Sequence, residues 1–336
     1  MNKIIYILSL CVLLFTGTAC RHSTQKYNEG SVRLFADEGF KSFMEQEIQV
    51  FEYQYPGSYI VPSYVSEVDA INGLIKDSCT LAITSKPLTQ QQIDYIKDKN
   101  KRIVRQQEIA IDAVALIVNK DNPIDEITVQ DLKDIFSGRV DLWRQLAGNP
   151  EDSVTVVFDQ MGSANVSYIE SNFLPKGGKF LPNVYAQKSN QDVIDFVAKD
   201  KSAIGLISVS WLGENLERVK KELDKDKLDS SAISHLEDET VDDLVINFTD
   251  EVKVLKVRKD DELMGYKPDQ RSIYGDEYTG KSQYPLMRKV YMISTAANNS
   301  VGHSFYAFVT GFIGQKILLM TGILPYQVPT RVVQLQ

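Results

Sequence analysis

Short apolar runs that are typical of β-strands alternate with helical segments along most of this chain. Val32–Ala36, Tyr59–Val65 and Leu81–Ile83 have the length and composition of buried strands. Between them, apolar residues recur at the three- and four-residue spacing of amphipathic helices. This alternation predicts βαβ units, and therefore a mostly parallel sheet that is covered by helices.

The same alternation continues through the second half of the chain. Its most apolar run is Ala113–Val118, and strands are also expected at Val154–Phe158, Ala203–Ser208, Val252–Val257 and Val290–Ile293. Thr128 is expected to begin a helix that Gly138 ends, and Thr89 to begin one in which Gln92 completes a capping box. The other expected helices are Phe40–Phe51, Val68–Ile75, Val166–Phe173, Val193–Val197 and Phe305–Met320.

The first twenty residues have the pattern of a bacterial secretion signal. Lys3 precedes the apolar run Ile4–Phe15, and small residues then lead to Cys20. The run is shorter than the ~20 residues that a membrane-spanning helix needs. We therefore expect residues 1–19 to be a lipoprotein signal peptide and Cys20 to carry the lipid. The alternative is an ordinary cleaved signal peptide with an incidental cysteine.

Composition excludes several other classes of protein. The net charge of −8 disfavours binding to nucleic acid, and no His, Cys and carboxylate cluster has the spacing of metal ligands. Residues 20–30 are polar and predict a flexible tether. Cys79 stands in an apolar context and is expected to be a buried thiol, so no internal disulfide is expected. We expect no cofactor and no metal.

One long segment differs from the rest of the chain. Residues 213–244 are rich in Lys, Glu and Asp, with few apolar side chains. We interpret this segment as a solvated surface helix or loop. His235 lies within it without a neighbouring His or Cys, which argues against a metal site.

Three junctions between a strand and a helix combine small, hydroxyl and charged residues. They are Asp37–Phe40, Thr84–Pro87 and Gly162–Asn165. Helix N-termini present unpaired backbone N–H groups and a partial positive charge, so junctions that converge would bind a small oxyanion. Each junction taken alone is also explained as a simple helix cap.

Longer stretches of the sequence resemble a known family. Ala113–Pro123 resembles the hinge-strand signature of the periplasmic phosphate-binding proteins of ABC importers. Asp131–Val140, with Trp143, is similar to the helix that follows that signature. Later landmarks of the family occur in the same order, at Ala203–Leu206, Tyr284–Arg288, Gly314–Ile317 and Gly322–Pro325.

This resemblance implies the α/β fold of a type II periplasmic binding protein. Each of two lobes would be a mixed sheet flanked by helices, and crossover hinge strands would join the lobes. Lobe I is expected to comprise residues 31–114 and 293–336, and lobe II residues 115–292. The resemblance also implies that three loops contact the anion. By position these contacts are Glu38, Gly39, Phe40, Ser85, Lys86, Gly162, Ser163 and Ala164.

Two departures from the family pattern concern the ligand. Asp37 and Glu38 stand where the family favours Ser and Thr donors, and two carboxylates repel a dianion unless one is protonated or turned away. A single acid would accept the proton of hydrogen phosphate and reject sulfate. The pair is equally explained by compensation of the helix dipole. The third loop lacks the usual arginine, which Lys86 could replace only as a less directional charge.

The sequence thus predicts a monomeric, lipid-anchored solute-binding protein of the cell envelope, facing the periplasm of a Gram-negative bacterium. It would capture phosphate or a related oxyanion for a membrane importer. The alternative is a divergent binding or envelope-interaction module of the same fold that no longer binds phosphate. A serine hydrolase at Ser163 is disfavoured, because the G-x-S-x-G elbow is absent and His235 and His303 are the only histidines outside the tether. We therefore expect no enzymatic activity.

Overall fold

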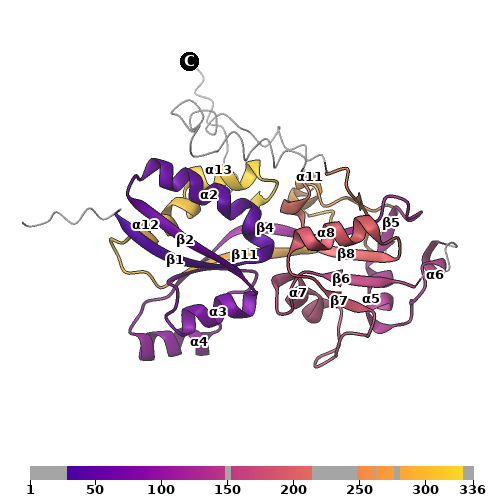
Figure 1. Cartoon of the computed structure of the whole chain (residues 1–336), viewed down its shortest axis with the longest axis horizontal. Helices are drawn as coiled ribbons and strands as arrows, with labels where there is room; N and C mark the ends of the chain where they lie inside the picture. The colour runs from indigo at the N-terminus through magenta and orange to yellow at the C-terminus, as the bar shows by residue number, and fades with distance from the viewer. Residues whose placement is uncertain (1–28, 148–152, 214–247, 261, 276–280, 328–336) are drawn as a thin grey trace, which may run out of the picture.

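The structure, a computed structural model, describes residues 29–147, 153–213, 248–260, 262–275 and 281–327. The signal peptide with Cys20 lies outside the described residues, as does the charged segment with His235 apart from its first residue. The described strands include an extended sheet in the order β2-β1-β3-β11-β4-β8-β6-β7. One half of this sheet belongs to each of two lobes, which lie side by side in Figure 1.

Lobe I is built on three parallel strands. Helices α2, α12 and α13 lie on one side of these strands, and α3 and α4 lie on the other (Figure 1). The strands follow the predicted apolar runs closely. The bounds are β1 (Gly30–Asp37), β2 (Ser58–Val65), β3 (Leu81–Thr84), η1 (Glu38–Phe40), α2 (Lys41–Gln54), α3 (Glu67–Ile75), α4 (Gln90–Tyr95), η2 (Ile96–Asn100), α12 (Val301–Thr310) and α13 (Phe312–Met320).

Lobe II repeats the arrangement with β8, β6 and β7, which are also parallel. Helix α8 packs on one side of this half of the sheet, and α5 and α7 lie on the other (Figure 1). The bounds are β6 (Thr155–Phe158), β7 (Val184–Ala186), β8 (Ala203–Ser208), α5 (Val129–Ser137), α6 (Arg144–Ala147), α7 (Ala164–Asn172), α8 (Asn190–Lys199), η3 (Val209–Trp211) and α11 (Gln270–Tyr274).

The two halves are joined by antiparallel strands, which the alternation of the sequence did not predict. The 14-residue strand β4 (Arg105–Val118) pairs with β11 (Met287–Ser294) through its first part and with β8 through Val114–Val118. The sheet is therefore mixed, as the family resemblance implied. The predicted strand Ala113–Val118 is only the second part of β4. Near its middle, β4 also pairs with the short strand β12 (Leu324–Pro325).

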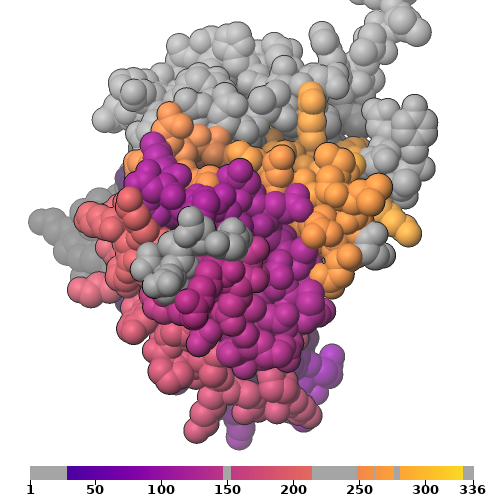
Figure 2. All heavy atoms as spheres, turned by 90° about the vertical axis from the view of Figure 1, so that its right-hand side faces the viewer, coloured from indigo at the N-terminus to yellow at the C-terminus, as the bar shows by residue number. Residues whose placement is uncertain are grey.

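The expectation of one strand over Val252–Val257 is wrong. The backbone N–H of Leu255 donates to Leu116 of β4, whereas that of Lys256 donates to Asp125 beside β5. The chain therefore passes from one sheet to another at this point. The pieces are β9 (Lys253–Val254), which pairs with β4, and β10 (Lys256–Arg258), which pairs with β5 (Glu126–Thr128). In Figure 2 the orange segment lies against the magenta segment that carries β5.

Capping residues in the sequence predicted several helix ends correctly. Thr89 and Gln92 form the predicted capping box, and Thr128 caps α5. Gly138 ends α5 in the left-handed conformation, with φ of 75°. The last helical segment divides into α12 and α13 at Gly311. Cys79 is buried as expected, and burial raises the pKa of its thiol to about 12.

Each lobe has its own hydrophobic core. The core of lobe I includes Phe43, Phe51 and Phe305, and that of lobe II includes Leu116, Trp143 and other fully buried residues. Among the described helices, none has the length and apolar character needed to cross a bilayer.

Gly205 of β8 tests the packing of lobe II. A Cβ atom at this position would lie 2.8 Å from Ile117 Cγ1 and 2.8 Å from Val193 Cγ1. We expect Gly205→Ala to lower the free energy of unfolding by about 1–3 kcal/mol, because the close-packed core must shift. Urea denaturation measures this change. The control Ser137→Ala, on an exposed residue, should change stability by no more than about 0.5 kcal/mol. Equal stability of Gly205→Ala and the control would contradict the packing.

Candidate functional site

Asp37 connects the two lobes through its carboxylate. It ends β1 and is fully buried. Its Oδ1 accepts a hydrogen bond from Gly39 N at 3.0 Å, which caps η1. Its Oδ2 accepts one from Ala164 N at 2.9 Å, at the start of α7 in lobe II. A carboxylate of lobe I thus lies at a helix N-terminus of lobe II, where the helix dipole favours a negative charge.

Glu38 makes a second contact of the same kind. Its Oε2 accepts hydrogen bonds from Asn190 N at 2.9 Å and from Asn190 Nδ2 at 2.6 Å. Asn190 is the first residue of α8, and Glu38 is buried. Two helix N-termini of lobe II therefore each receive a carboxylate from lobe I.

A third buried carboxylate, Asp159, belongs to lobe II. It follows β6 and accepts a hydrogen bond from Ser163 Oγ. Its Oδ2 also accepts from Asn165 Nδ2 at 3.1 Å and from Asn190 Nδ2 at 3.2 Å. Asn190 therefore connects the Asp159 carboxylate to that of Glu38.

Arg288 of β11 supplies the buried positive charge beside these acids. Its Nε donates to Asp112 Oδ2 at 2.8 Å, and its Nη2 lies 2.7 Å from the same oxygen. Asp112 lies on β4 and also accepts a hydrogen bond from Ser208 Oγ at 2.8 Å. The Arg288 guanidinium lies 5.0 Å from the centre of the Phe40 ring. Its buried Nη1 has no hydrogen-bond partner among the described residues.

Burial shifts the protonation of this interlobe cluster, which we define as Asp37, Glu38, Asp112, Asp159 and Arg288. Desolvation raises the pKa of Asp37 well above its ordinary value, and the nearby Asp159 raises it further. Desolvation also raises the pKa of Asp159 to about 7 and raises those of Glu38 and Asp112. Burial opposes the charge of Arg288, but the carboxylates of Asp112 and Asp37 outweigh this effect and raise its pKa. The acids of the cluster therefore bind protons more tightly than the same side chains do in water.

The other predicted residues of the first and third loops adjoin this cluster. Gly39 lies against Arg288, since a Cβ on Gly39 would be 3.5 Å from Arg288 Nη2. Phe40 is fully buried beneath the guanidinium. Gly162 has φ of 78°, a conformation that favours glycine, and its carbonyl accepts a hydrogen bond from Val68 N of lobe I. Two of the three predicted junctions therefore meet between the lobes.

The second junction lies beside the cluster without sharing its hydrogen bonds. Both Ser85 N and Ser85 Oγ donate to Glu67 Oε2 at 2.5 Å. Lys86 Nζ donates to Ser171 Oγ at 3.2 Å and to Ser167 O at 3.5 Å. Lys86 thus reaches lobe II along α7, away from the helix N-terminus that Asp37 contacts.

Sequence reasoning missed Arg288 as a site residue, although Tyr284–Arg288 was among the family landmarks. A local signal exists, because Arg288 alternates with Val290 and Met292, which are fully buried on the same strand. Arg102 pairs with Asp77, and Arg105 donates to Ala296 O, so neither side chain belongs to the interlobe cluster.

Several groups in and around the cluster are hydrogen-bond donors of the kind that oxyanion sites use. The amides of Ala164 and Asn190 and the Nη1 of Arg288 are hydrogen-bond donors, which suit a negatively charged ligand. No group of three or more His, Cys, Asp or Glu side chains within the described residues could hold a metal ion.

Comparison with known proteins places this chain in a family. A family model described as "PBP superfamily domain" matches residues 23–313. The chain belongs to the PBP superfamily. The phosphate-binding protein PstS of Staphylococcus aureus strain USA300 is 25% identical to the chain over 150 residues. This alignment covers 44% of the chain and 44% of the relative, so less than half of the relative's length is matched.

Solved structures show the same fold over most of the chain. A putative phosphate ABC transporter substrate-binding protein from Clostridium perfringens, with bound phosphate, has a TM-score of 0.64 at 19% identity. It covers 89% of this chain and 100% of that protein. An ABC-type phosphate transport receptor from Vibrio cholerae has a TM-score of 0.57 at 19% identity, over 88% of this chain and 100% of that protein. The two-lobed α/β fold is therefore confirmed, and the family model confirms membership of the superfamily.

Asp159 gives the cluster a measurable pH dependence. Its raised pKa means that the folded protein binds this proton more tightly than the unfolded chain does, so its contribution to stability falls as pH rises from about 4 to about 7. Asp159→Asn removes the titration. We therefore expect the free energy of unfolding of Asp159→Asn, taken relative to that of wild type, to increase by about 1–3 kcal/mol from pH 5 to pH 8. Urea denaturation at several pH values measures the trend.

Asp121→Asn is the matched control for this pH series. Asp121 is exposed, and its hydrogen bond with Lys201 lowers its pKa, so it does not titrate above pH 5. Its stability difference from wild type should stay flat over the same range. A flat line for Asp159→Asn as well would show that Asp159 is ionised throughout.

Proposed function

We propose that this protein is an extracytoplasmic solute-binding protein that captures phosphate or a related small oxyanion between its lobes and delivers it to a membrane importer. The observation that carries the proposal is the convergence of anion donors at the lobe interface. The helix N-terminal amides of Ala164 and Asn190 gather there with the buried guanidinium of Arg288. The names of the similar proteins support the same ligand class.

The carboxylates of the cluster mark the positions that a ligand oxygen would take. Asp37 Oδ2 and Glu38 Oε2 are each 2.9 Å from a helix N-terminal amide, which is an ordinary distance for an oxyanion acceptor. A phosphate oxygen at either position would accept the same hydrogen bond. Because each carboxylate and its amide belong to different lobes, opening of the lobes would separate them and expose the donors.

Charge is the main obstacle to a dianion, and two features reduce it. Burial raises the pKa values of Asp37 and Asp159, so these acids take up a proton more readily than in water, and a protonated acid donates a hydrogen bond instead of repelling the ligand. The Nη1 of Arg288 also has donor capacity that Asp112 does not use. Arg288 would thus take the role of the arginine that the third loop lacks.

We also propose where the protein lies in the cell and that its binding domain is a monomer. The secretion signal and Cys20 support a lipid anchor in the envelope of a Gram-negative bacterium, with a periplasmic, monomeric binding domain. We assign residues 31–114 and 293–336 to lobe I and residues 115–292 to lobe II. The change of partner strand near the middle of β4 supports a hinge there.

One observation favours a second candidate function. Asp37 and Glu38 already satisfy the amides that a ligand would need, and Asp159 adds a further acid on the lobe II side. If these contacts are permanent, the protein is a divergent binding or envelope-interaction module of the same fold that no longer binds phosphate.

Calorimetry with Asp37 and Arg288 variants separates these functions. We expect phosphate to bind the wild-type mature domain, and Arg288→Gln to weaken binding at least tenfold, or about 1.4 kcal/mol, because it removes the buried positive charge. Asp37→Asn should tighten binding, since it replaces the acid that competes with the ligand for Ala164 N. If Asp37 instead accepts the proton of hydrogen phosphate, Asp37→Asn would weaken phosphate binding while leaving sulfate unchanged.

Arg102→Gln is the matched control, because Arg102 pairs with Asp77 at a partly exposed position. It should bind phosphate as the wild type does. Thermal unfolding checks that each variant is folded. If folded wild type and folded Asp37→Asn both give no heat with phosphate or sulfate, the first function is refuted and the second is supported.

A further inference from the structure

Lobe II contains a cavity that is separate from the interlobe cluster. Its volume is about 560 Å³, within the ~300–1,000 Å³ of typical small-molecule sites. It lies between α5, α7 and the segment that leads into β11. None of the five residues of the interlobe cluster lines it.

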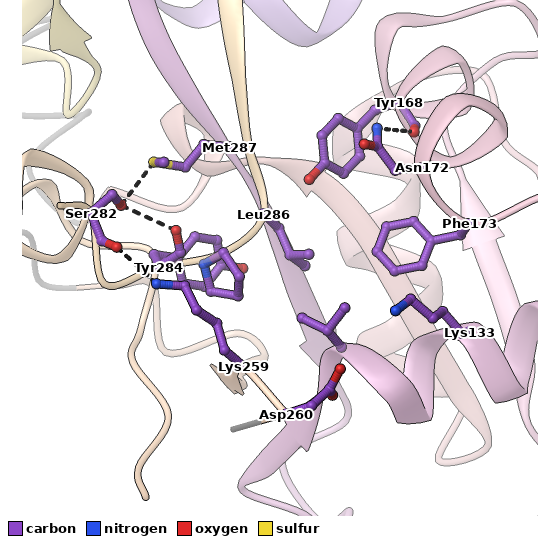
Figure 3. Close-up of a pocket in the computed structure, with 12 residues that line it drawn as sticks. Lys133, Tyr168, Asn172, Phe173, Lys259, Asp260, Ser282, Tyr284, Leu286 and Met287 are labelled. Carbon is purple, nitrogen blue, oxygen red and sulfur yellow. Dashed lines mark hydrogen bonds between the residues drawn. The ribbon is translucent and has the colours of Figure 1, made fainter. Parts of the chain in front are cut away.

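Aromatic and aliphatic side chains form its walls. Tyr168 of α7 and Phe173, which directly follows α7, lie on one side, and Leu286 lies opposite them (Figure 3). The two aromatic rings are 6.3 Å apart between centroids and are inclined by 52°. Ring edges and faces therefore line the cavity, which suits a flat apolar group that packs against them.

Lys133 gives the cavity an available positive charge. Its ammonium group points into the space beside Phe173 (Figure 3), and it has no ion-pair partner within the described part of the chain. The other charged groups of the lining, Lys259 and Asp260, make contacts outside the cavity. Lys259 Nζ donates to Ser282 O and pairs with Glu262, whereas Asp260 Oδ1 accepts a hydrogen bond from Gln130 N.

Tyr168 adds a neutral donor. Its side chain is partly buried, and burial raises the pKa of the phenol to about 12, so the hydroxyl keeps its proton at neutral pH. Within the described residues, this hydroxyl has no hydrogen-bond partner, and it points into the cavity in Figure 3. A ligand oxygen could accept from it.

We propose that this cavity binds a small carboxylic acid that carries a flat ring. The ring packs between Phe173 and Leu286, and the carboxylate pairs with Lys133. The cavity shares no lining residue with the interlobe cluster, so either proposal can fail without the other.

Three related compounds test the charge requirement. Indole-3-acetate carries the ring and the carboxylate, indole-3-acetamide replaces the acid by a neutral amide, and tryptamine carries an amine. We expect indole-3-acetate to bind the folded mature domain at least fivefold more tightly than either analogue, as measured by calorimetry. Saturating phosphate should not displace it, because the two sites are separate.

Lys133→Gln is the decisive variant. It should lower the affinity for indole-3-acetate to that for the amide and leave phosphate binding unchanged. Phe173→Leu should weaken acid and amide alike, because it reduces the ring contact. Lys97→Gln, at an exposed position of lobe I, is the matched control and should bind as the wild type does. Equal affinity for acid, amide and amine, or no binding of the acid tighter than about 1 mM, would overturn the proposal.

Discussion

The buried ion pair between Arg288 and Asp112 is the interaction on which the lobe interface depends. It joins β11 to β4, the strand that runs through both lobes. The guanidinium faces four buried carboxylates in the interlobe cluster, so full ionisation would leave an excess of negative charge in a desolvated space. The raised pKa values of Asp37 and Asp159 resolve this conflict, because protonation removes charge that Arg288 alone does not balance.

In the proposed function, the donors that connect the two lobes are the same donors that would bind the anion. Asp37 and Glu38 take the helix N-terminal amides of lobe II, and Trp211 Nε1 donates to the carbonyl of Gly39 across the interface. A ligand anion competes with these acids for the same N–H groups. Under the proposed function, the affinity for the anion would therefore depend on the protonation of these carboxylates.

Membership of the superfamily establishes the fold of this chain, but it does not establish the ligand. The similar structures have the same fold, although only 19% of the aligned residues are identical. A shared fold supports many functions. The specific chemistry of this chain lies in individual substitutions. Asp37 and Glu38 replace expected hydroxyl donors, and the buried arginine comes from β11 rather than from the loop before α7.

The sequence by itself determined the local elements, because their signals are local. The strands of each lobe follow apolar runs, and Thr128 and Gly138 mark the ends of α5 through the hydrogen bonds and backbone conformation of nearby residues. Two of the three junctions also meet as the sequence predicted. Only the tertiary structure decided that β4 and β11 are antiparallel and that Arg288 lies among the acids. Strand partners and charge contacts join residues far apart in the chain, so no local pattern specifies them.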